Sequence, residues 1–221
     1  MNVPRWVWIA AALAGGVAIA KPAHTPWSFA LYPAPPEQDK GEFYAWLGPM
    51  ARDTQRRSGI PASVRMAQAW RESRQTGGGL SALAIDGRNL YGMKRGGCTG
   101  HYASGSGHYP TWEVRADGSR EEVRAEFMHY PSHYASTLQQ CRLFYCALAY
   151  WPALAHRADP LLFLAHMAPV YATDPNYAAA IANDIDHWDL TRWDLTPWEW
   201  DLEGDIVGER HLATWRRAVG A

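Results

Sequence analysis

The sequence predicts a mainly α-helical (α+β) fold with one small β-hairpin. Apolar residues recur at helical spacing over most of the chain, as Phe43, Leu47 and Met50 do within residues 41–58. Between residues 94 and 132 the chain instead becomes rich in Gly and Ser and then alternates around Asp117-Gly118, a dipeptide typical of tight hairpin turns. Together the two patterns favour a helical body beside a short antiparallel pair of strands.

Prolines and glycines mark where the expected helices begin and end. Pro61 suits the first turn of a helix, and the glycine run at 77–79 stops the helix that it begins. Pro152 is expected to break one helix, whereas Pro160 and Pro175 are expected to begin the next two. The predicted helices cover 41–58, 61–72, 80–85, 132–150, 160–167 and 175–187, and the predicted strands cover 112–115 and 122–127.

Length and composition indicate one domain with tails. The 221 residues suffice for a single domain of ordinary size. A net charge of −1 provides no basic field, so we expect no nucleic-acid partner. The 12 Trp and 11 Tyr are many for this length; such rings can stack on sugar faces, although most are expected in the core.

The N-terminus has the pattern of a targeting segment. Arg5 precedes an apolar run over residues 6–20, and Ala18-Ile19-Ala20 fits a small-x-small cleavage site. A signal peptide over 1–20 is favoured over an uncleaved anchor in the inner membrane, which Trp6 and Trp8 would support. Either reading predicts an exported domain, periplasmic or extracellular. A Pro/Ala-rich linker (21–40), a catalytic domain (41–194) and a Trp-rich acidic extension packed on that domain (195–221) are expected to follow.

Glu72 is the first candidate for chemistry. It falls near the end of the predicted helix, just past the edge of an apolar arc and close to the negative end of the helix dipole. Partial shielding and the dipole both raise the pKa of a carboxyl group, which favours the protonated state that a general acid needs. A solvated surface Glu is the alternative for a lone carboxylate on a helix.

The three cysteines allow at most one intramolecular disulfide. Cys141 and Cys146 lie five residues apart on one predicted helix and point in different directions, which disfavours a bridge between them. In an oxidising compartment Cys98 is therefore expected to pair with one of the two. No Cys–His spacing resembles a zinc site, and no metal or cofactor is implied.

Three segments together resemble one enzyme family. They are GIPASV at 59–64 with AQAWRES at 67–73, NLYGMK at 89–94, and YATDPNY at 171–177. The combination resembles the glucosaminidase domain of glycoside hydrolase family 73, over roughly residues 42–194. The resemblance implies a lysozyme-like fold, in which a helical lobe and a small β-lobe flank a groove. After Ser73 the family usually continues Gly-Trp-Gly, whereas this chain has Arg74-Gln75-Thr76, so the groove wall there differs.

The resemblance also implies roles for particular residues. Glu72 would be the general acid, Glu113 the second carboxylate in the β-lobe, and Tyr171 a phenol that steadies charge near the anomeric centre. Asp117, Glu121 and Glu122 compete with Glu113 for the second role. Expected substrate-binding residues are Gln68, Asn89, Tyr91 and Tyr177, although an Asn before a tight turn also satisfies backbone groups and Tyr177 also suits a structural position.

The implied reaction is hydrolysis of the β-1,4 bond between N-acetylglucosamine and N-acetylmuramic acid in peptidoglycan glycan strands, by a monomeric enzyme. The alternatives are a muramidase or lytic transglycosylase on a similar fold, and a non-catalytic wall-binding or secretion-machine module. Because the extension is acidic, it is a poor anchor for anionic wall polymers. Trp193, Trp198 and Trp200 are instead expected to bury against the helical lobe.

Overall fold

The computed structural model describes residues 32–75, 77–114 and 119–219. The described fold is that of the compact unit Pro33–Ala221. The expected signal peptide or anchor (1–20) and the first part of the linker lie outside the described residues. Among the helices that are described, none combines the length and the apolar character needed to span a bilayer.

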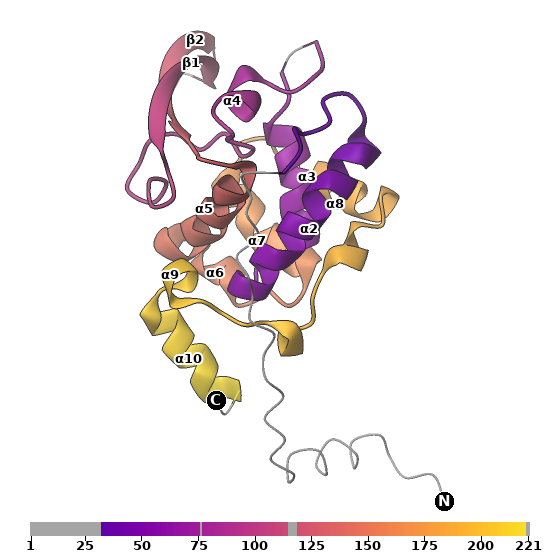
Figure 1. Ribbon diagram of the computed structural model, residues 1–221, viewed down its shortest axis with the longest axis vertical. Helices are drawn as coiled ribbons and strands as arrows, with labels where there is room; N and C mark the ends of the chain where they lie inside the picture. The colour runs from indigo at the N-terminus through magenta and orange to yellow at the C-terminus, as the bar shows by residue number, and fades with distance from the viewer. Residues whose placement is uncertain (1–31, 76, 115–118, 220–221) are drawn as a thin grey trace, which may run out of the picture. The chain divides into compact units, whose positions relative to one another are not determined.

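Helix α3 (Ala62–Glu72) is the central helix of the helical lobe (Figure 1). It contacts α2 (Lys40–Ser58), α7 (Pro160–Tyr171) and α8 (Tyr177–His187). Because neighbours surround it, every residue from 62 to 69 is buried, and this part of the helix is covered on all sides rather than on the single face that its apolar arc predicts. The lobe is completed by α4 (Ala82–Ile85), α5 (His133–Cys146), the 3-10 turn η2 (Leu148–Tyr150) and α6 (Trp151–Leu154).

A distant carboxylate fixes the start of α3. Pro61 precedes the helix and gives no side-chain cap. Asp194 instead accepts hydrogen bonds from the Ser63 backbone N (2.9 Å) and the Ser63 Oγ (2.6 Å). A negative charge at this end also suits the helix dipole. The direction in which α3 delivers its last residue therefore depends on a residue 131 positions away.

The helix boundaries differ from the sequence predictions after Cys146 and at the end of α7. The helix expected over 132–150 ends at Cys146, because Ala147 adopts an extended conformation (φ −89°, ψ 113°). Pro152 does not break this helix; it lies in the first turn of α6, where its missing N–H costs nothing. Helix α7 continues past the expected end at Met167 to Tyr171.

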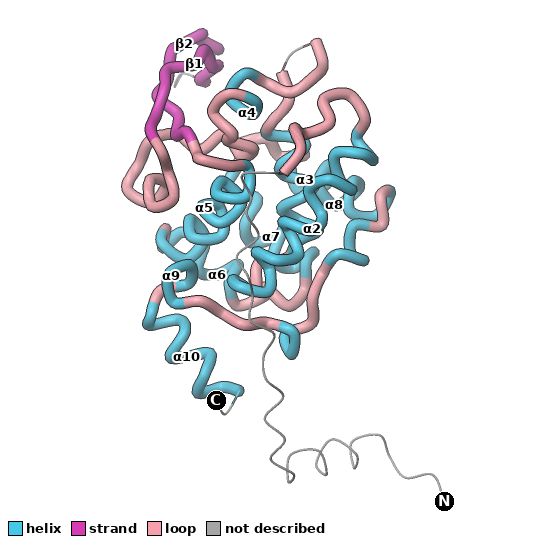
Figure 2. Tube along the Cα trace, in the orientation of Figure 1, coloured by secondary structure: helices cyan, strands magenta, loops and turns pink. Residues whose placement is uncertain are grey.

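The β-lobe is a two-stranded antiparallel hairpin (Figure 2). Strand β1 (Gly105–Val114) pairs with β2 (Arg120–His129), in a register that places Gly105 opposite His129 and Glu113 opposite Glu121. Both strands are longer than predicted, and the expected Asp117-Gly118 turn lies outside the described residues. Backbone bonds from Arg95 N to Glu126 O (2.8 Å) and from Met128 N to Met93 O (3.0 Å) join β2 to the segment that follows Asn89.

A disulfide holds the segment that enters the hairpin. Cys98 pairs with Cys146 at the end of α5, with a Cα–Cα distance of 5.7 Å, and Cys141 is buried and free. The structure thus selects one of the two pairings left open by the sequence. Gln139 of α5 adds hydrogen bonds to the Cys98 carbonyl (2.7 Å) and from the Tyr102 N–H (2.8 Å).

The 3-10 turn η3 (Leu190–Trp193) precedes the C-terminal extension (195–221), which runs through η4 (Pro197–Glu199), α9 (Gly204–Val207) and α10 (Glu209–Val219). Trp200 is buried, and Trp193 is half-buried against α2, where a Cβ on Gly48 would come within 2.5 Å of its ring. The expectation is wrong for Trp198, which is 89% exposed. It projects from η4, a single 3-10 turn without any buried residue.

Candidate active site

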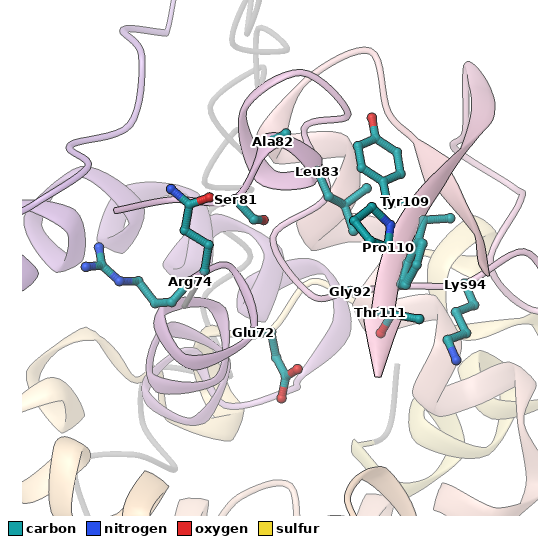
Figure 3. Close-up of a pocket in the computed structure, with 12 residues that line it drawn as sticks. Glu72, Arg74, Ser81, Ala82, Leu83, Gly92, Lys94, Tyr109, Pro110 and Thr111 are labelled. Atoms are coloured by element: carbon teal, nitrogen blue, oxygen red, sulfur yellow. The ribbon is translucent and has the colours of Figure 1, made fainter. Parts of the chain in front are cut away.

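A cavity of about 440 Å³ separates the end of α3 from the hairpin. Figure 3 shows Glu72 on the helical side of this cavity, with Tyr109, Pro110 and Thr111 on the strand across from it. Its lining residues are Glu72, Arg74, Gln75, Ser81, Ala82, Leu83, Gly92, Lys94, Tyr109, Pro110, Thr111 and Phe127. Both lobes therefore contribute walls to one space, and Glu72 is the carboxylate among its lining residues.

Glu72 occupies the last position of α3, where the chain turns away from the helix. Ser73 caps the helix by donating its N–H to Ala69 O (3.0 Å). Arg74 then forms a bridge with Leu80 across the glycine run, whose three residues all have φ between 73° and 98°. Only glycine adopts that conformation without strain, so the run folds back and leaves Glu72 facing the cavity.

The environment of Glu72 suits a general acid. Burial of the side chain raises the pKa of the Glu72 carboxyl above its ordinary value, while the Tyr177 hydrogen bond and the Arg71 charge oppose that rise. Desolvation is the larger effect, because a charged carboxylate loses solvation in the cavity wall. At a given pH a larger fraction of Glu72 is therefore protonated than of an ordinary glutamate, and the protonated form is the one that a general acid needs.

A chain of three hydrogen bonds orients Glu72 from the core. The Tyr177 hydroxyl donates to Glu72 Oε1 (2.8 Å), Gln68 Nε2 donates to the Tyr177 oxygen (3.0 Å), and Gln140 Nε2 donates to Gln68 Oε1 (3.0 Å). Gln68 and Gln140 are fully buried and Tyr177 is 3% exposed. The chain leaves Glu72 Oε2 free of this network, so that oxygen is the one available to a leaving group.

Tyr171 lies beside this chain rather than in it. Its ring stacks on that of Tyr177, with centroids 5.8 Å apart and an interplanar angle of 25°. Its hydroxyl donates to the backbone carbonyl of Tyr91 (2.8 Å). Burial and the nearby Glu72 raise the pKa of the Tyr171 phenol well above its usual value, so the phenol remains a neutral donor. Tyr171 thereby fixes the turn that carries Gly92 into the cavity wall.

The NLYGMK turn is built around Asn89. The Asn89 amide donates to Met93 O (3.0 Å) and Met128 O (2.9 Å), and its oxygen accepts from the N–H groups of Tyr91 and Met93. The residue is 1% exposed. Asn89 therefore ties the turn to β2, and the structure does not bring its side chain to the cavity. Gly92 has φ 58°, a value that favours glycine.

Tyr91 is buried behind the same turn. Its side chain is 2% exposed, and its hydroxyl has no hydrogen-bond partner among the described residues. Gln68, Tyr177 and Tyr91 therefore lie beneath Glu72, not in the cavity lining. Their expected contact with substrate stays a prediction, whereas Tyr177 contacts Glu72 directly, Gln68 does so only through Tyr177, and Tyr91 is part of the turn.

The expected second carboxylate belongs to the hairpin. The backbone of Glu113 lies near the end of β1, opposite Glu121, and the Glu113 side chain lies outside the described part of the structure. Thr111, two residues earlier on β1, lines the cavity. Of the competing residues, Glu122 is exposed opposite Trp112, and Asp117 lies outside the described residues. Among the residues that are described, no cluster of His, Cys, Asp or Glu is arranged to hold a metal ion.

Sequence reasoning missed several parts of the site. Tyr109 and Thr111 share the strand period that placed the hairpin, so alternation could have identified them. Gln140 belongs to a polar, buried stretch of α5 that includes Ser136, Thr137 and Gln139. A run of polar residues on a buried helix indicates an internal hydrogen-bond network, and this was the available signal.

Fold and site together define a two-lobed, lysozyme-like glycosidase domain with a buried carboxyl group, that of Glu72, at a helix end beside a cavity. The family described as mannosyl-glycoprotein endo-beta-N-acetylglucosaminidase matches residues 48–190, and the chain belongs to this glucosaminidase family. The fold class, the family resemblance and the glycosidase class expected from the sequence are confirmed.

Individual proteins and a solved structure are also similar to this chain. The chain is 32% identical over 167 residues to Autolysin from Enterococcus faecalis, covering 71% of this chain and 21% of that protein. It is 32% identical over 135 residues to the exo-glucosaminidase LytG from Bacillus subtilis, covering 58% and 44%. The catalytic domain of the autolysin Auto from Listeria monocytogenes has the same fold, with a TM-score of 0.59 and 23% identity over 88% of this chain and 99% of that one. The chain thus spans less than half the length of these curated relatives.

Proposed function

We propose that the protein is a peptidoglycan hydrolase that cleaves the β-1,4 bond between N-acetylglucosamine and N-acetylmuramic acid. The observation that carries the proposal is Glu72: a desolvated carboxyl with a raised pKa, held by Tyr177 and facing a cavity between two lobes. Relatives named autolysin and exo-glucosaminidase support the same substrate class.

Glu72 donates its proton to the glycosidic oxygen as the bond breaks. Tyr177 then donates its hydrogen bond to the carboxylate that forms, so the core network receives the new charge. Tyr171 contributes by holding the Tyr91–Gly92 turn against the acid. Its expected action near the anomeric centre requires its hydroxyl to leave the Tyr91 carbonyl when substrate binds.

Glu113 is proposed as the second carboxylate, which activates the attacking water. Residues two apart on a strand share a face, and Thr111 supports placing position 113 on the cavity side. If Glu113 is too distant when the cavity closes on substrate, the substrate's own acetamido group takes over this step. Glu113→Gln separates the two cases, because only the first loses activity.

The proposed location is outside the cytoplasm, in the periplasm or beyond it. The Cys98–Cys146 disulfide supports an oxidising compartment. Similarity to a relative named autolysin supports the same location.

The test is the chemistry of the ends that are released. Purified peptidoglycan is digested with the full chain, reduced with borohydride and analysed by mass spectrometry. The proposal expects reduced N-acetylglucosamine ends. Reduced muramic ends would indicate a muramidase, anhydro-muramic ends a lytic transglycosylase, and binding without release a non-catalytic module. Product length separates endo from exo cleavage.

A further inference from the structure

A second cavity lies on the other side of Arg74 from the catalytic one. Its volume is about 350 Å³, and it lies between the start of α2, the end of α3 and α8. Arg74 lines both cavities, and Figure 3 shows its side chain pointing away from the β1 residues that face Glu72. The lining residues are Lys40, Trp70, Arg71, Arg74, Ala180, Asn183 and Asp184.

The lining carries an excess of positive charge. Lys40, Arg71 and Arg74 contribute cations and Asp184 contributes one carboxylate, which Lys40 Nζ contacts at 2.6 Å. Arg71 has its own partner outside the lining, Asp174, at 3.0 Å, and both of these side chains are more than 40% exposed. A pair that exposed is weak and leaves Arg71 able to attract a second anion.

Of the three cations that line this cavity, Arg74 is the one with no carboxylate partner among the described residues. Its guanidinium stacks on the Trp70 ring, 4.2 Å from the ring centroid, and one of its nitrogens donates to the backbone carbonyl of Glu37. Stacking holds the guanidinium plane in place while its remaining N–H groups point along that plane. A stacked arginine presents the fork that binds a carboxylate in two places.

The position of this cavity beside Glu72 indicates what would fill it. Arg71 and Arg74 flank Glu72 in the sequence and Arg74 lines both cavities, so a group bound here would belong to one of the two sugars that the broken bond joins. Of these two, N-acetylmuramic acid is the one whose lactyl group carries an acidic peptide. We propose that this basic cavity, lined by Arg74 and Asn183, binds a carboxylate of the stem peptide and makes the enzyme prefer peptide-bearing strands. The inference rests on the proposed function.

The test compares peptide-bearing glycan strands with the same strands stripped of peptide by an amidase. The quantity measured is the ratio of kcat/KM on the two substrates, because a general loss of catalysis cancels in this ratio. The full chain is expected to favour the peptide-bearing strands. Arg74→Gln should reduce the ratio about tenfold, mainly through KM, since a charged contact of this kind is worth about a factor of ten or more.

The kcat/KM ratio is measured for two further variants, one in the cavity and one as a control. Asn183 is exposed and lines the basic cavity but not the catalytic one. Asn183→Asp adds a negative charge there, which would repel a carboxylate, so it should also lower the ratio. Arg52→Gln is the matched control, because Arg52 is similarly part-exposed, pairs with Glu199 at 3.3 Å and lines neither cavity. Its ratio should equal that of the wild type.

Equal kcat/KM on both substrates, or equal losses on both in Arg74→Gln and Asn183→Asp, would overturn the inference and leave the proposed function standing. Release of the wrong ends, or of none, would overturn the proposed function. Equilibrium binding of a Glu72→Gln chain to the two kinds of strand then decides the inference without cleavage: roughly tenfold tighter binding of peptide-bearing strands, lost on adding Asn183→Asp, supports it, and equal affinities refute it.

Discussion

Breaking the Cys98–Cys146 disulfide should lower stability by an amount set by the chain that it closes. The two cysteines are 48 residues apart. In the chain-entropy description, a loop of that length restricts the unfolded state by about 4 kcal/mol. For a domain of this size each kcal/mol shifts Tm by roughly 2–4 °C, so the loss should be on the order of 10 °C.

The assay is a thermal melt of the wild type with and without reductant, beside a Cys98→Ser/Cys146→Ser double variant. The Tm of the variant should be close to that of the reduced wild type and should not change when reductant is added. Cys141→Ala is the control: it keeps the bridge and must keep the response to reductant. Initial cleavage rates at 25 °C should change little, because Gln139 still binds both sides of the segment at Cys98. A reductant effect under about 2 °C, or peptide mapping that finds Cys141 in the bridge, would refute the reasoning.

Two further substitutions test the packing and the acid. Gly48→Ala should lower the free energy of unfolding by about 1–3 kcal/mol, since its Cβ would lie 2.5 Å from the Trp193 ring. Gly97→Ala is the control, because a Cβ there would meet no atom within 4 Å. Equal urea midpoints for the two variants would contradict this contact. Tyr177→Phe removes a hydrogen bond that lowers the pKa of Glu72. The alkaline limb of the kcat/KM profile, where Glu72 loses its proton, should therefore move to higher pH; an unchanged or lower limb would show that Tyr177 does not act on the acid.

The local parts of the site were accessible from the sequence. The proline at the start and the helix end at Glu72 are encoded in neighbouring residues, and the structure has both, with Pro61 as the residue just before the helix. The predicted glycine stop is wrong, because Ser73 caps the helix and the glycine run folds the chain back only after it. The strands were predicted too short because Gly105, Ser106 and Gly107 have poor strand propensity. Their pairing with 127–129 is secured by the register of the hairpin and by the Ser104 N to His129 O bond (2.9 Å).

The long-range parts were not accessible. Tyr171 and Tyr177 lie in one heptapeptide, and the break between α7 and α8 decides which phenol reaches Glu72. Gln140 joins the network from 72 residues beyond Gln68. Cys141 and Cys146 share one helix, so only the approach of the Cys98 segment chooses between them. The polar run on α5 indicates that a buried network exists, but the partner that each of these residues meets follows from tertiary contacts that no local pattern encodes.

The central claim is that Glu72 is the proton donor of a glucosaminidase. The most direct measurement is the initial rate at which reduced N-acetylglucosamine ends appear from purified peptidoglycan, for wild type and Glu72→Gln. Gln keeps the shape and can still accept the Tyr177 hydrogen bond, and removing a buried charge should leave Tm at neutral pH unchanged or higher. The account expects the rate to fall by about 10²–10⁴. A folded Glu72→Gln chain that releases these ends within tenfold of the wild-type rate would contradict it.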